Sequence, residues 1–109
     1  MISTFVPRLL DYHPQAVPVP YYHHNVDADE FLFYSVGQFF SRRGISAGSI
    51  TLHRGEFVHG PQPGVIESSL GKKDTNELAV MVETYRRLRL TTFAKEIDDN
   101  KYMLSWSQS

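Results

Sequence analysis

Residues 20–36 read PYYHHNVDADEFLFYSV, and this stretch decides the fold. β-Branched and aromatic residues dominate over 19–24 and again over 30–40, as is typical of strands. The polar run 25–29 between these two segments is typical of a turn. The stretch therefore predicts a hairpin of two antiparallel strands.

Weaker signals lie on both sides of this hairpin. Prolines at positions 7, 14, 18 and 20 disfavour a long helix, so residues 1–18 are predicted to be an extended arm. Turn signals and apolar residues predict further strands over 49–53 and 77–84. Only residues 91–98 have helical character, because Phe93 and Ile97 are four positions apart.

Several short strands joined by glycine and proline turns are typical of an all-β sandwich or small barrel. We predict a cupin or jelly-roll barrel, partial or single, with a short C-terminal helical segment. Residues 19–109 would form this one domain after the arm 1–18. In the strand that begins at Glu30, apolar side chains such as Leu32 and Phe33 fall on alternate faces, so both faces need cover. A chain this short is expected to borrow a second layer from a missing domain or a neighbouring subunit.

The composition of the 109 residues excludes several kinds of partner. Positive and negative residues are well mixed and the net charge is -1, so neither nucleic acid nor a membrane is expected to bind. The opening MISTFVPRLLD lacks a signal-peptide pattern, and no segment reaches the roughly 20 apolar residues of a bilayer span, so we expect a cytoplasmic protein. Because the sequence has no cysteine, any metal must be held by His, Asp and Glu.

The strongest chemical signal is a cluster of histidines. Four of the five lie in two pairs, His23 with His24 and His53 with His59, and Glu30 follows the first pair. Successive strand residues point to opposite faces, so one histidine of the first pair would face inward with Glu30. Two imidazoles and one carboxylate on one side of a metal suit Fe(II) that activates oxygen, but they also suit catalytic zinc. The residue types leave both metals open.

The sequence resembles the C-terminal, iron-binding half of the homogentisate dioxygenase family over most of its length. The resemblance is carried by PYYHHNVDADEF at 20–31, GSITLH at 48–53, HGP at 59–61 and ELAVMVET at 77–84. It implies a cupin domain in which His23, Glu30 and His59 bind Fe(II).

The resemblance also implies roles for residues around the metal. His53 is expected near the substrate as a catalytic acid or base, a role that suits an imidazole titrating near neutrality. Contacts to the substrate are expected from Tyr21, Phe39, His53 and His59. Phe39 stands where the family has a tyrosine, so one hydrogen bond to the substrate is expected to be missing. The amide of Asn25 is expected to orient a ligand or a water molecule.

The function implied by the resemblance is ring cleavage by an Fe(II) dioxygenase. Its substrates would be O2 and homogentisate or a related hydroxylated aromatic acid, as in the catabolism of tyrosine and phenylalanine. Two other classes of function stay open: a metal-dependent cupin isomerase or hydrolase, and a truncated or degenerate cupin that serves for binding or oligomerisation. Because enzymes of the family also have an N-terminal cupin half, we expect a homo-oligomer or association with such a half.

Overall fold

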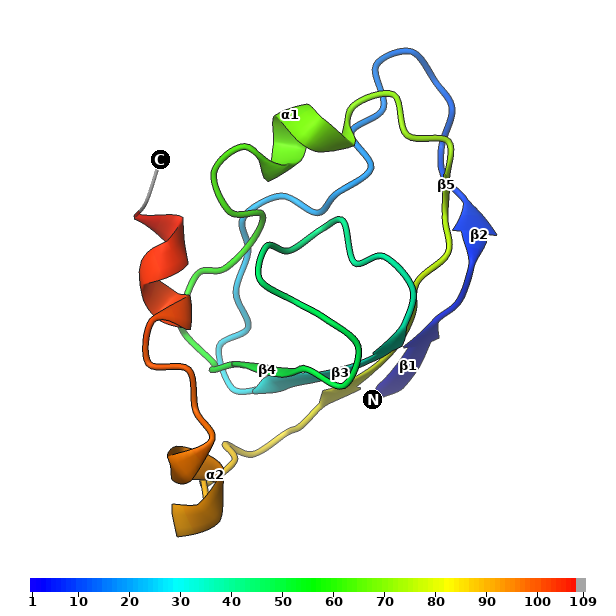
Figure 1. Cartoon of the computed structure of the whole chain (residues 1–109). Coiled ribbons are helices and arrows are strands. Elements are labelled where there is room, and N and C mark those ends of the chain that lie inside the picture. The colour runs from blue at the N-terminus through cyan, green and yellow to red at the C-terminus, as the bar shows by residue number, and fades with distance from the viewer. Residues whose placement is uncertain (108–109) are drawn as a thin grey trace.

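The computed structural model describes residues 1–107 and shows one larger and one smaller β-sheet (Figure 1). The larger sheet is antiparallel with the order β1-β6-β3-β4, formed by β1 Ile2–Phe5, β6 Leu78–Glu83, β3 Glu30–Val36 and β4 Ile50–His53. The smaller sheet pairs β2 Arg8–Leu9 with β5 Asp74–Thr75. The helical elements are α1 Val65–Ser69, α2 Thr92–Glu96 and the 3-10 helix η1 Tyr102–Trp106.

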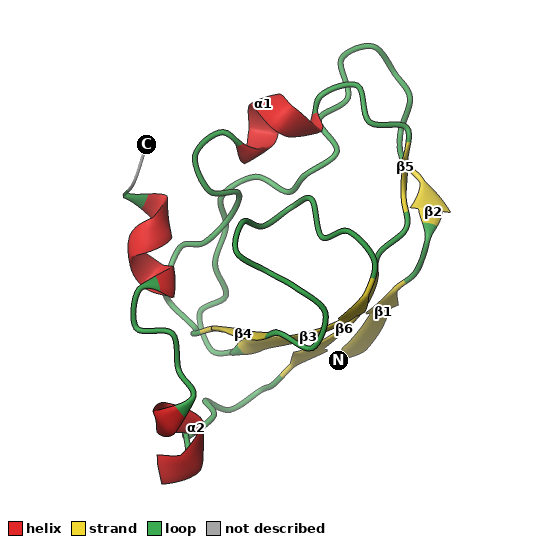
Figure 2. Ribbon diagram, viewed as in Figure 1, coloured by secondary structure: helices red, strands yellow, loops and turns green. Residues whose placement is uncertain are grey.

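The predicted all-β class with a short C-terminal helical segment is confirmed. Long loops and α1 lie over one face of the larger sheet, and η1 lies beside them (Figure 2). Neither sheet closes on itself within residues 1–107, so this part of the chain is an open, cupin-like β-structure. Within residues 1–107, every helix is too short or too polar to span a bilayer.

The strands predicted over 49–53 and 77–84 are confirmed as β4 and β6, but the strand predicted over 19–24 is wrong. That segment is a loop in which only His23 makes a bridge, and β3 pairs with β4 and β6 instead. The physical reason is the pair of prolines at positions 18 and 20, because a proline has no N–H to donate to the hydrogen bonds of a sheet.

The second predicted strand is shorter than expected, because β3 ends at Val36 and does not reach position 40. Gly37 has a φ of 108°, a left-handed conformation that an L side chain rarely adopts. A Cβ at Gly37 would also collide with the backbone carbonyl of Asn76. The chain therefore turns here, and Phe39 enters the core from a loop.

The two ends of the chain depart from the sequence-based expectations in detail. Residues 2–5 are extended as predicted, but they form an edge strand, β1, which pairs with β6. The helix predicted over 91–98 is present as α2, and the Thr91 side chain caps it by accepting the N–H of Ala94 at 3.1 Å. Phe93 and Ile97 are nevertheless 69% and 71% exposed, because α2 projects away from the sheet (Figure 1).

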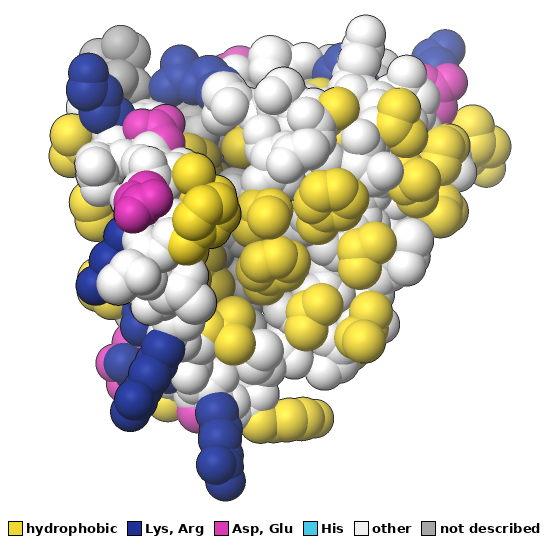
Figure 3. Space-filling model, turned by 60° about the horizontal axis from the view of Figure 1, so that its bottom comes forward, with side chains coloured by type: hydrophobic (Ala, Val, Ile, Leu, Met, Phe, Trp, Pro, Cys, Tyr) yellow, Lys and Arg dark blue, Asp and Glu magenta, His cyan; other side chains and the backbone are white. Residues whose placement is uncertain are grey.

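The larger sheet has two different faces. Its inner face carries the core, in which Tyr34 and Ala79 pack with Phe39. Its outer face carries the alternate residues of the same cross-strand pairs, Ile2, Thr4, Phe31, Phe33, Ile50, Leu52, Val80 and Val82. Figure 3 shows hydrophobic side chains gathered on this side, with charged ones at the rim. We call these eight residues the outer face.

Candidate metal centre

Two histidines from different loops are held side by side by the backbone. The N–H of each of His23 and His59 donates to the carbonyl oxygen of the other, both at 2.9 Å. Directly opposed residues in an antiparallel pair project to the same face. The two imidazole centroids are accordingly 4.5 Å apart, whereas the neighbouring His24 is exposed.

The strands β3 and β4 add a carboxylate and a third imidazole. Glu30 and His53 are direct cross-strand partners, and His53 Nδ1 lies 2.9 Å from Glu30 Oε1. The ring of His53 stacks on that of His59 with centroids 4.4 Å apart. Both Glu30 and His53 are buried, so the pairing takes place away from water.

The three ligands predicted from the sequence come together at one point. One ligand atom from each of His23, Glu30 and His59 lies within 4.8 Å of the other two. Glu30 and His59 are buried and His23 is half-buried. The side chains thus form a compact donor set of two nitrogens and one oxygen, with space for a cation between them.

Backbone carbonyls fix which nitrogen of each candidate ligand histidine faces the cluster. His23 Nδ1 is 2.7 Å from the carbonyl oxygen of Tyr21, and His59 Nδ1 is 3.0 Å from that of Phe57. A carbonyl oxygen only accepts, so both Nδ1 atoms must carry the proton. When the rings are neutral, both Nε2 atoms have a free lone pair for a cation.

His59 Nε2 is the atom that best reports what the cluster can hold. It is buried and has no hydrogen-bond partner among residues 1–107, and it lies 3.5 Å from Glu30 Oε2. An unpaired buried nitrogen beside a carboxylate is unfavourable unless a proton or a cation lies between them. The donor set therefore fits a divalent cation.

The electrostatics of the cluster are consistent with a stable carboxylate. Burial raises the pKa of Glu30, but the hydrogen bond from His53 and the nearby His59 imidazole outweigh it, so the pKa lies well below its usual value. Burial lowers the pKa of His53 despite the hydrogen bond to Glu30. Burial also lowers the pKa of His59, but the nearby Glu30 carboxylate and the hydrogen bond to the Phe57 carbonyl exceed that effect and raise it overall. Glu30 is therefore an anion at neutral pH.

Comparison with known proteins identifies the family. The family model for the C-terminal part of homogentisate 1,2-dioxygenase matches residues 2–109. The chain belongs to this family.

Two curated relatives are much longer than this chain. A protein of Saccharolobus solfataricus that is provisionally named a dioxygenase is 60% identical over 111 aligned positions, covering 100% of this chain and 29% of the relative. The homogentisate 1,2-dioxygenase of Rhizobium meliloti is 35% identical over 96 positions, covering 81% of this chain and 21% of the relative. The chain thus spans less than a third of the length of either relative.

In this member of the homogentisate dioxygenase family, the other predicted site residues have different surroundings. The side chain of Tyr21 is 84% exposed, and only its carbonyl contacts a ligand. The backbone carbonyl of Asn25 accepts the N–H of Glu56 at 2.6 Å. Phe39 is buried in the core, where its ring centroid lies 5.0 Å from that of Tyr34. Substrate contacts by Tyr21 and Phe39, and the orienting role of the Asn25 amide, stay predictions.

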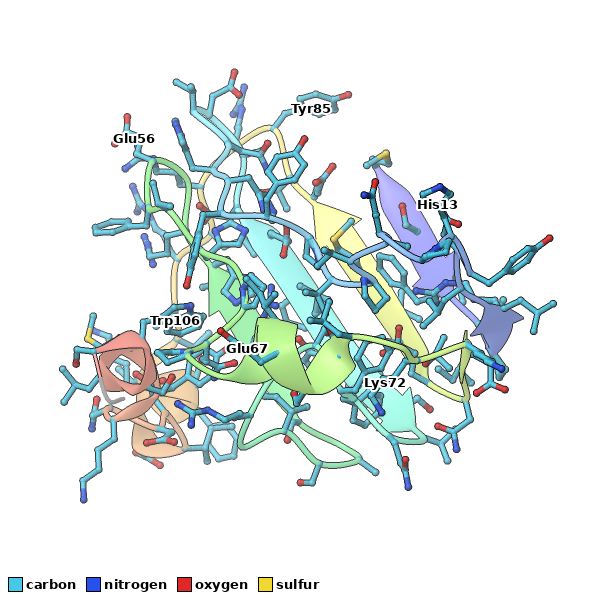
Figure 4. The ribbon with its side chains drawn as sticks, turned by 90° about the horizontal axis from the view of Figure 1, so that it is seen from above. His13, Glu56, Glu67, Lys72, Tyr85 and Trp106 are labelled. Atoms are coloured by element: carbon cyan, nitrogen blue, oxygen red, sulfur yellow. The ribbon has the colours of Figure 1, made fainter. Side chains whose placement is uncertain are left out.

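The C-terminal segment η1 packs against the cluster, because Tyr102 and Trp106 lie beside the ring of His53. Trp106 Nε1–H donates to the carbonyl oxygen of Gly60 at 2.9 Å, and Gln62 Nε2–H donates to Ser105 Oγ at 3.2 Å. Gln62 is only 1% exposed and also accepts the N–H of Arg43 at 2.9 Å, which joins a third segment. Figure 4 shows Trp106 where η1 meets the loops over the sheet, far from His13. Gln62 therefore joins the loop after His59 to the loop after β3 and to η1.

Glycine is required in the HGP triplet because a ring lies over it. A Cβ at Gly60 would come within 2.8 Å of Tyr22 Cδ1. The Tyr22 hydroxyl donates to the carbonyl oxygen of Pro61 at 2.9 Å, which holds that ring against the triplet. The same contact joins the segment before His23 to the segment after His59.

Asp29 is a second buried acid, next to the candidate ligand Glu30, and its carboxylate is bonded to the backbone. It is fully buried, and its two carboxylate oxygens accept the N–H of Gly55 at 2.8 Å and that of Leu88 at 2.7 Å. Burial raises the pKa of Asp29, but these backbone hydrogen bonds outweigh it and lower the pKa overall. Asp29 thereby ties together the loop after β4 and the segment after β6, at the position where β3 begins.

Proposed function

We propose that this chain is the metal-binding part of an Fe(II)-dependent ring-cleaving dioxygenase that acts on homogentisate or a related hydroxylated aromatic acid. The observation that carries the proposal is the convergence of His23, Glu30 and His59 within 4.8 Å in a member of this family. Two imidazoles and one carboxylate on one side of a metal leave positions open for reactants, as in non-haem Fe(II) oxygenases.

The chain's own residues would prepare the site in three ways. His23 and His59 would offer Nε2, because their Nδ1–H groups are held by backbone carbonyls. Glu30 would offer Oε2, while its Oε1 is held by His53. Fe(II), when bound, supplies the site at which O2 and a chelating aromatic acid meet. The cover of η1 would keep bulk water from the imidazoles.

His53 would handle protons beside the metal. It keeps a proton on Nδ1 toward Glu30, so its Nε2 can accept a hydrogen from the Tyr102 hydroxyl or from a ring hydroxyl that takes its place. A lowered pKa keeps this imidazole neutral and able to accept. We therefore assign His53 the role of acid and base toward the substrate hydroxyl.

The proposed function is tested by metal analysis and oxygen uptake. Anaerobically purified chain is expected to bind about one Fe(II) and then to consume O2 when homogentisate is added, with gentisate as the comparison substrate. Tight binding of zinc or manganese, with no oxygen uptake, would favour a cupin isomerase or hydrolase. A folded chain that binds no metal would favour a degenerate binding module.

The variant His53→Gln is expected to lose far more turnover than affinity for the metal. Losing a positioned proton-transfer group typically slows turnover by about 100- to 10,000-fold, while the three ligands of Fe(II) remain. Turnover is measured as oxygen uptake at saturating Fe(II), and bound iron is measured on the same sample. Full turnover in this variant would contradict the assigned role.

We also propose that the outer face packs against a second copy of the chain. None of its eight residues is charged, and Ile2, Phe33 and Ile50 are 74%, 39% and 55% exposed. A large exposed apolar surface marks an interaction site in a soluble protein. Because the face is neutral, two copies can meet without repulsion between like charges, and sheets pack face to face about 10 Å apart.

The variant Phe33→Glu is expected to convert the dimer to a monomer, because it places a charge in the middle of the buried interface. The matched control is Phe93→Glu, which changes a 69% exposed phenylalanine on α2, away from the sheet. Light scattering coupled to gel filtration gives the mass of each. A monodisperse monomer for the unmodified chain would contradict the proposed packing of two copies through the outer face.

A further inference from the structure

The position of Tyr102 is fixed by several contacts that do not involve its own hydroxyl. Its backbone carbonyl accepts the hydroxyl of Ser105 at 2.6 Å, and Ser105 in turn accepts from Gln62. One turn later, Trp106 is bonded to Gly60 and packs edge-on against Tyr102 with centroids 5.1 Å apart. The position of the Tyr102 ring is therefore set by η1 and does not depend on a hydrogen bond of its hydroxyl.

The hydroxyl of Tyr102 belongs to a chain of hydrogen bonds that starts at the candidate metal cluster. Glu30 Oε1 lies 2.9 Å from His53 Nδ1, and His53 Nε2 lies 3.3 Å from the Tyr102 hydroxyl. A carboxylate only accepts, so Nδ1 carries the proton and Nε2 of the neutral ring must accept. The Tyr102 hydroxyl is then the donor, and its ring lies nearly parallel to that of His53, at 17°.

We propose that Tyr102 is a positioning residue of the metal centre. By donating to Nε2 it holds His53 in the tautomer that directs Nδ1–H at Glu30 Oε1, and this bond leaves Glu30 Oε2 facing His59 and the cation. The expected effect on metal affinity rests on the proposed function. The expected tautomer of His53 does not. Residues that hydrogen-bond to a metal ligand orient it and typically contribute about 10- to 100-fold to metal affinity. Tyr102 acts through His53, so about tenfold is expected.

The first test is the state of the His53 ring in metal-free protein, measured by nitrogen-15 NMR of the imidazole. The unmodified chain is expected to show a protonated Nδ1 and an unprotonated, hydrogen-bonded Nε2. Tyr102→Phe is expected to shift the Nε2 signal to that of an unbonded nitrogen. The control Tyr22→Phe removes another phenol hydroxyl, bonded to Pro61, and is expected to leave the His53 signals unchanged. A protonated Nε2 in the unmodified chain would overturn the proposal.

The second test is a double-mutant cycle on Fe(II) affinity, measured anaerobically against a competing chelator. Tyr102→Phe is expected to weaken binding by about tenfold in the unmodified background and by little in the His53→Gln background, because the path through His53 is then already broken. Equal losses in both backgrounds would mean that Tyr102 only stabilises the fold, and would overturn the proposal. If the unmodified chain binds no cation, the proposed function fails, and the tautomer measurement alone decides the role of Tyr102.

Discussion

Replacing His59 with alanine is expected to abolish both Fe(II) binding and oxygen uptake. His59 is one of the three side chains whose ligand atoms converge, and its buried Nε2 has no hydrogen-bond partner among the described residues. Loss of an outer partner of a metal ligand already costs about 10- to 100-fold in affinity, so loss of the ligand itself should exceed that. Binding is measured by anaerobic titration with Fe(II), and activity by oxygen uptake with homogentisate at saturating iron.

The matched control is His24→Ala, which removes the exposed neighbour of the ligand His23. This variant is expected to bind iron and turn over like the unmodified chain, because His24 lies outside the converging set. Circular dichroism and thermal melting are used to check that both variants fold. If His59→Ala keeps normal affinity for iron, the ligand assignment fails. If both variants lose iron equally, the histidine pairs stabilise the fold and hold no metal.

The position of the three candidate ligands could be predicted because sequence spacing and family resemblance agree. The polar turn 25–29 separates His23 from Glu30, so the alternation of strand faces does not carry across it, and both can face the same point. The HGP triplet placed His59 in a loop, and the structure pairs that loop with His23 through the backbone. The convergence therefore follows from features that are visible in the sequence.

The surroundings of the ligands could not be predicted, because they depend on backbone groups. The carbonyls of Tyr21 and Phe57 fix the two ligand imidazoles, and every residue has a carbonyl, so no residue type indicates them. The 3-10 helix η1 is one short turn without an amphipathic repeat, so Tyr102 gave no signal of its contact with His53. The strand predicted over 19–24 is absent for a different reason. Aromatic residues favour a strand there, but the prolines deprive it of donors.

Asp29→Ala is expected to be among the most destabilising single changes in the chain. It leaves the N–H of Gly55 without its acceptor in a buried position and that of Leu88 without its acceptor in a half-buried one. Each unsatisfied buried donor costs about 1–3 kcal/mol, so we expect a loss of about 2–4 kcal/mol in the free energy of unfolding. In a domain of this size that lowers the melting temperature by roughly 4 °C or more per kcal/mol.

The control for Asp29 is Asp27→Ala, two positions earlier and exposed, which is expected to change stability by less than about 0.5 kcal/mol. Asp29→Asn keeps one acceptor oxygen and should fall between the two. Urea unfolding of the metal-free proteins gives all three values. Because Asp29 fixes the chain where β3 begins, its loss should also loosen Glu30 and weaken Fe(II) binding. Equal unfolding midpoints for the alanine variants at 27 and 29 would show that the buried carboxylate does not hold these loops.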